Sequence, residues 1–169
     1  GYPVVGVYDS NGVNLTEGFE VLSAYGDVVK ASAAVSGVVP QISIIAGTCL
    51  GVLSVVANMA DVVVAVKDAD FYISAPNDVT AEDNYKSGSI DILSESFEEA
   101  VASVKNLVAL LPQNNIAPTP IFDFAAPSTV AADSMSADDI IKSIADENSI
   151  VEIKSGYGNN LTTCLLYTS

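Results

Sequence analysis

The chain has 169 residues, of which 50% are hydrophobic and 16% are charged, and six lysines against 21 aspartates and glutamates give it a formal net charge of −15. This hydrophobic content excludes a disordered chain, and the acidic charge argues against a nucleic-acid partner because phosphate recognition needs clustered cations. The sequence contains no histidine, which excludes Ser-His-Asp and Cys-His catalysis, and its two cysteines are too few for a disulfide framework or a zinc site.

The first predicted elements are a strand, a loop and a helix. The apolar run at residues 3–8 predicts a buried strand, and residues 9–15 form a turn-rich loop. Thr16 is a candidate cap for a helix over residues 17–36, and Gly37 is a suitable residue to end it.

The most apolar stretch of the chain covers residues 42–66. It changes character along its length, so we expect a strand at 40–46, a helix at 49–59 and a β-branched strand at 61–66. A membrane span needs about 20 unbroken apolar residues. The stretch is instead interrupted by Gly47, Thr48, Gly51, Asn58 and Asp61.

The next elements are shorter. Residues 71–73 read as a strand, residues 77–88 as a polar loop with room for one helical turn, and residues 90–93 as a further strand. Ser96 then starts a helix that extends to about Leu111 and carries an apolar stripe.

The composition changes at residue 112, where a proline-rich linker begins and continues to residue 134. Ser136 and Asp139 have the spacing of a capping box for a short helix that ends near Asp146, and residues 149–154 read as a strand. Alternating strands and helices predict a layered α/β fold.

Two loops are candidates for chemistry, at residues 9–13 and 47–52, because each lies between a strand and a helix. First-turn amides have no intrahelical partner and lie at the positive end of the helix, where they suit a phosphate or a developing oxyanion. The carboxylates are spread along the chain without a catalytic spacing. A reaction here is therefore expected to use backbone amides, with an ordinary strand–Gly–helix turn as the alternative.

Several stretches together resemble a known family, the carboxyltransferase subunits of biotin-dependent acyl-CoA carboxylases and decarboxylases. The N-terminal lobe of that family is similar to residues 1–10, Ser36-Gly37-Val38-Val39-Pro40-Gln41, Gly47-Thr48-Cys49-Leu50-Gly51-Val52 and Leu110-Leu111-Pro112-Gln113-Asn114-Asn115. Residues 138–162 resemble the opening of the second lobe, whereas residues 164–169 look like a non-native, translated adapter sequence.

The resemblance implies a crotonase-like fold of repeated ββα units, incomplete at both ends. It divides the chain into an acyl-CoA-binding lobe at 1–111, a linker at 112–134 and the truncated start of a second lobe at 135–169. The expected location is cytoplasmic, since the sequence has few cysteines and no signal-peptide pattern.

The resemblance also implies carboxyl transfer between carboxybiotin and an acyl-CoA through a thioester enolate. The amides of Gly51 and Val52 would form the oxyanion hole, and replacing Gly51 by a bulky residue is expected to lower transfer far more than folding. No metal is expected. The substrate would contact Gly12, Val13, Cys49, Leu50 and Pro76.

The implied cofactors are biotin, carried on a partner protein or domain, and coenzyme A as part of the substrate. The implied partners are a biotin carboxyl carrier protein, further copies of the chain in a dimer or trimer of dimers, and a membrane decarboxylase subunit. Two alternatives remain: a non-catalytic structural homologue within such a complex, and a biotin-independent crotonase-type CoA enzyme.

Overall fold

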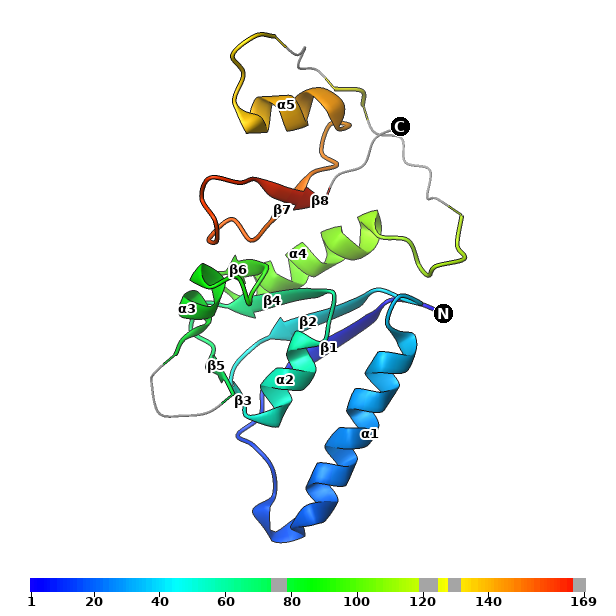
Figure 1. Ribbon diagram of the computed structural model, residues 1–169, viewed down its shortest axis with the longest axis vertical. Coiled ribbons are helices and arrows are strands. Elements are labelled where there is room, and N and C mark those ends of the chain that lie inside the picture. The colour runs from blue at the N-terminus through cyan, green and yellow to red at the C-terminus, as the bar shows by residue number, and fades with distance from the viewer. Residues whose placement is uncertain (74–78, 119–124, 128–131, 166–169) are drawn as a thin grey trace.

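The computed structural model describes residues 1–73, 79–118, 125–127 and 132–165. Its centre is a parallel sheet with the strand order β1-β2-β4-β6 (Figure 1). These strands are β1 Val4–Tyr8, β2 Gln41–Ile45, β4 Val62–Val66 and β6 Ile92–Ser94. Each overlaps a run that its β-branched or apolar residues predict as a strand. The expected burial of the first strand is wrong, because β1 lies at the edge of the sheet and Val4, Val5 and Val7 are 50%, 42% and 55% exposed.

The predicted ββα repeat is present. Strand β2 is followed by β3 (Cys49–Leu50) and α2 (Val52–Asn58), and β4 is followed by β5 (Phe71–Tyr72) and α3 (Ala81–Lys86). Strands β3 and β5 pair in parallel as a small second sheet. The expected helix start at Cys49 is therefore wrong: α2 begins at Val52, because residues 49–50 pair with β5 and Gly51 has a φ of +62°.

Helix α1 covers Phe19–Val35 and follows the short 3₁₀ helix η1 at Leu15–Glu17. The expected cap at Thr16 is wrong, because the side chain of Asn14 accepts the Thr16 N–H and caps η1. The structure describes all of α1, and none of its residues is buried. The helix leans away from the sheet (Figure 1), so the apolar face expected from the sequence is largely uncovered.

The sheet has a packed core on each face. On one face Cys49, Ala57, Phe71 and Ile90 belong to a cluster that includes residues of α2, β3 and β5. On the other face α4 (Phe97–Leu110) packs through Val104 and Leu107 and similar residues. The Ser96 side chain accepts the Glu99 N–H, which confirms Ser96 as the cap of α4.

The C-terminal segment contains α5 (Ala137–Ile144) and an antiparallel pair, β7 (Val151–Ile153) and β8 (Thr163–Leu165). The predicted capping box of Ser136 and Asp139 is present. Val151 and Leu165 pack against the α4-side core, which joins this segment to the sheet region. Residues 166–169 lie outside the described part, and the foreign origin of the tail remains a prediction.

In the part of the chain that the structure describes, no helix combines the length and apolar character that crossing a bilayer requires.

Candidate functional site

The two candidate loops leave the same edge of the sheet, as expected. Strands β1 and β2 are parallel neighbours, so the loops at their carboxyl ends are adjacent. The Ser10 N–H donates to the Thr48 carbonyl at 2.7 Å, and the Thr48 N–H donates to Asp9 Oδ1 at 3.2 Å. The side chain of Asp9 also fills the space where a Cβ at Gly47 would lie.

The expected oxyanion donor at Gly51 is already in use. The Gly51 N–H donates to the Tyr72 carbonyl at 2.9 Å, and the Cys49 N–H donates to the Asp70 carbonyl at 2.8 Å. Both bonds belong to the ladder between β3 and β5, where Cys49 faces Phe71 and Leu50 faces Tyr72. Gly51 therefore ends the ladder and caps α2.

The backbone N–H groups without an acceptor are those of the first two residues of α2. Ser54 makes the first bond of α2, since its N–H donates to the Gly51 carbonyl at 3.1 Å and its hydroxyl donates to the same oxygen at 2.7 Å. Among the described residues, the N–H groups of Val52 and Leu53 have no acceptor, as first-turn amides usually do not. Leu53 was missed because Leu50 extends the helical spacing of Leu53, Val56 and Ala57 backwards and so hides the true start of α2.

Among the described residues, the exposed side chains at the start of α2 and the end of β5 include aliphatic ones. The side chains of Val52 and Val55, one helical turn apart, are 42% and 41% exposed, and Ile73 is 64% exposed. The carbonyl of Ile73 lies 3.8 Å from the position of a Cβ on Gly51, which places the end of β5 beside the start of α2.

The other predicted contact residues differ in their surroundings. Gly12 is exposed, and Val13 lines a hollow of about 390 Å³ with residues of η1 and α1, including Val21 and Tyr25. Cys49 is fully buried, and burial raises the pKa of its thiol to about 12, so it stays protonated within the core. Leu50 is half-buried, and Pro76 lies outside the described residues.

Positive charge is scarce, and the described residues hold three ion pairs of the chain's six lysines. Lys67 lies 3.1 Å from Glu95, Lys86 lies 2.8 Å from Glu82, and Lys154 lies 2.9 Å from Asp91. The hydrogen bond and the charge of Glu95 raise the pKa of Lys67. The structure offers no group of three or more acidic or cysteine side chains that could hold a metal ion in the residues it describes.

Comparison with known proteins gives one consistent result. The family model described as "Carboxyl transferase domain" matches residues 1–165. The chain is 33% identical to the methylmalonyl-CoA carboxyltransferase 12S subunit of Propionibacterium freudenreichii subsp. shermanii, over 96% of this chain and 36% of that protein. It is 32% identical to the propionyl-CoA carboxylase beta chain of Roseobacter denitrificans, over 96% of this chain and 38% of that protein.

Solved structures agree. A crystal structure of transcarboxylase 12S, described as a hexamer with hydrolysed methylmalonyl-coenzyme A bound, matches with a TM-score of 0.86 and 32% identity, over 96% of this chain and 38% of that one. This match confirms the crotonase-like α/β fold. The chain spans a little over a third of the length of these relatives.

Proposed function

The chain belongs to the carboxyl transferase domain family, and from this membership we propose that it forms the acyl-CoA-binding part of a biotin-dependent carboxyltransferase. The names of its relatives include methylmalonyl-CoA and propionyl-CoA, so a short acyl-CoA is the proposed substrate. The observation that carries the proposal is the pair of open amides at Val52 and Leu53 beside the junction of the β1 and β2 loops.

The proposed chemistry needs these amides. Forming or breaking a carbon–carboxylate bond next to a thioester places negative charge on the carbonyl oxygen. The Val52 and Leu53 N–H groups, at the positive end of α2, would donate to that oxygen as the charge develops. One such donor is typically worth about 3 kcal/mol in the transition state. The Gly51 amide contributes indirectly, because its bond to Tyr72 holds the start of the helix in place.

Biotin would be the second substrate, and it supplies a nitrogen that accepts and releases the carboxyl group. The methionines of this chain, Met59 and Met135, flank none of its lysines, so a Met-Lys-Met attachment pattern is absent from this sequence. We therefore propose that biotin arrives on a carrier protein or on another domain. The paired state of Lys67, Lys86 and Lys154 leaves few cations for the CoA phosphates, and we expect weak CoA affinity.

The experiment measures decarboxylation of methylmalonyl-CoA or malonyl-CoA with free biotin by the full-length protein that contains this chain. Val52→Ala and Val52→Gly remove side-chain bulk beside the amides, and both are expected to preserve or raise kcat/KM. Val38→Ala is the matched control, since Val38 is 41% exposed and lies before the start of β2, at the opposite end of the sheet from the loop that leads to α2. A Val38→Ala change that raises kcat/KM as much as Val52→Ala does would remove the site assignment.

The absence of turnover in the parent and in both Val52 variants would favour the non-catalytic homologue. The engaged amide of Gly51 is the observation that keeps this alternative open. A homo-oligomer is also proposed, because the related transcarboxylase 12S is described as a hexamer assembly. Light scattering on the full-length protein tests it, and a monomer would contradict it.

A further inference from the structure

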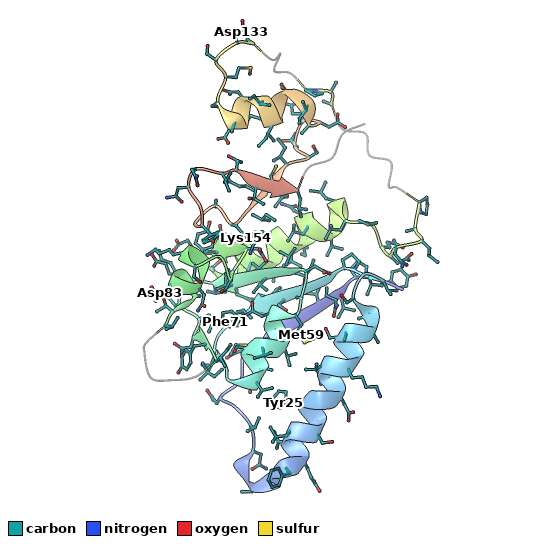
Figure 2. The ribbon with its side chains drawn as sticks, viewed as in Figure 1. Tyr25, Met59, Phe71, Asp83, Asp133 and Lys154 are labelled. Carbon is teal, nitrogen blue, oxygen red and sulfur yellow. The ribbon has the colours of Figure 1, made fainter. Side chains whose placement is uncertain are left out.

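The turn after β7 docks on the sheet region through Lys154. The Lys154 N–H donates to the Asp91 carbonyl at 2.7 Å, and its Nζ lies 2.9 Å from Asp91 Oδ1 and 2.5 Å from the Gly88 carbonyl oxygen. Lys154 has a φ of +57°, an unusual backbone conformation for a non-glycine residue. Figure 2 shows Lys154 where the C-terminal segment meets the sheet region.

Asp91 connects this lysine to the central sheet. Its side chain is only 8% exposed, and its second oxygen, Oδ2, accepts the Val63 N–H at 2.7 Å. The carboxylate is therefore satisfied from β4 on one side and from Lys154 on the other. Loss of Lys154 would leave a buried charge without its counter-ion, which is strongly unfavourable.

The residues after Lys154 rest on α3 and the turn that follows it. The hydroxyl groups of Ser155 and Tyr85 share a hydrogen bond, and Gly156 lies so close to the Tyr85 ring that a Cβ would overlap it. Similarly, a Cβ on Gly88 would lie 2.9 Å from the ring of Tyr157. The turn and α3 thus fit together at positions that leave no space for a larger side chain.

Helix α3 in turn holds the ladder next to the candidate site. The Asn84 side chain donates to the Phe71 carbonyl of β5 at 2.5 Å. Strand β5 pairs with β3, and its Tyr72 carbonyl accepts the Gly51 N–H. The contacts are continuous from Lys154, through α3 and β5, to the residue that caps α2.

We propose that the turn at residues 154–157 is a clamp that positions the first-turn amides of α2, with Lys154 and Asp91 as its positioning residues. Docking of the C-terminal segment fixes α3, and α3 fixes the β3–β5 ladder from which α2 starts. The catalytic meaning of the clamp rests on the proposed function, whereas the coupling itself is a property of this chain. The acyl site is then fully formed only when the C-terminal segment is docked.

The experiment follows backbone amides of the 169-residue chain by ¹⁵N NMR and hydrogen exchange. Lys154→Met is expected to shift the Gly51 and Val52 resonances and to speed exchange of the Gly51 amide by about tenfold or more. Exchange of Ile44 in β2 reports on the global fold and is expected to change much less. Lys154→Arg keeps the charge and is expected to restore protection. Lys142→Met, on α5, is the control and is expected to leave Gly51 unchanged.

Faster exchange in β7 with an unchanged Gly51 amide would overturn the proposal, because the clamp would then act only locally. Exchange at Ile44 that accelerates as much as exchange at Gly51 would indicate global loss of stability. In that case the double variant Asp91→Asn/Lys154→Met tests the clamp, because it removes the buried charge as well. An unprotected Gly51 in that folded variant supports the clamp, and a protected one refutes it. These readouts need no turnover, so a failure of the proposed function is seen separately.

Discussion

Two glycines of this chain allow backbone strain to be separated from function. Gly18 caps α1 with φ 59° and ψ −132°, and Gly51 caps α2 with φ 62° and ψ −132°. This region of backbone conformation is nearly restricted to glycine. The substitutions Gly18→Ala and Gly51→Ala therefore impose the same torsional strain at two different places in the fold.

The expected cost follows from the surroundings of each Cβ. Within the described residues, no atom lies within 4 Å of the added carbon at Gly18, and the nearest one at Gly51 is the Ile73 carbonyl oxygen at 3.8 Å, an ordinary contact. Steric overlap contributes at neither site, so the cost is torsional and amounts to about 1–3 kcal/mol in each variant. The expectation that a change at Gly51 lowers transfer far more than folding is thereby revised, because the positive φ makes stability fall as well.

Urea unfolding of the parent chain and both variants, followed by circular dichroism, measures this cost. With an m-value of about 2 kcal/mol/M, a loss of about 2 kcal/mol lowers the midpoint by about 1 M. In the full-length protein Gly51→Ala is also expected to lower kcat/KM, since it turns the Val52 amide, whereas Gly18→Ala is expected to leave kcat/KM unchanged under conditions where both proteins are folded.

The two results that would refute this reasoning are distinct. An unchanged midpoint for Gly51→Ala beside a lowered one for Gly18→Ala would mean that the loop at Gly51 adopts an ordinary conformation. Unchanged midpoints for both would mean that neither helix start requires glycine.

Three further predictions concern the core, the buried thiol and a helix cap. Phe71→Ala empties a fully buried site and is expected to lower the free energy of unfolding by about 3–5 kcal/mol in urea. Phe19→Ala, at a position 88% exposed, is expected to change it little. Similar losses in both variants would contradict the packing described. The Cys49 thiol is expected to resist Ellman's reagent in the folded chain. The pKa of this thiol rises from about 9 to about 12 on folding, so the free energy of unfolding is expected to fall by about 1.4 kcal/mol per pH unit between these values. A free energy of unfolding that does not change over this pH range would argue against burial of the thiol. Ser136→Ala removes the N-cap of α5 and is expected to cost about 1 kcal/mol of helix stability, seen as faster amide exchange in α5, whereas unchanged exchange would show that the cap is dispensable.

Much of the fold could be read from local chemistry. The runs of valine and isoleucine in β2 and β4 identify buried strands because β-branched residues suit a fully covered sheet. The caps at Ser96 and Ser136 were predictable because a capping side chain bonds to an amide only three residues away. The meeting of the loops after β1 and β2 followed from their order in a parallel sheet.

Contacts between distant residues decided the rest. Cys49 and Leu50 form a strand only because Phe71 and Tyr72 lie beside them, and that pairing changed the pair of open amides from the predicted Gly51 and Val52 to Val52 and Leu53. The periodicity of α1 indicates an apolar face, but periodicity says nothing of what covers that face. The ion pair of Lys154 with Asp91 likewise joins residues from separate parts of the sequence. Sequence patterns record a residue's own preferences and those of its near neighbours, whereas a hydrogen bond or ion pair between distant residues exists only once the folded chain has brought both partners together.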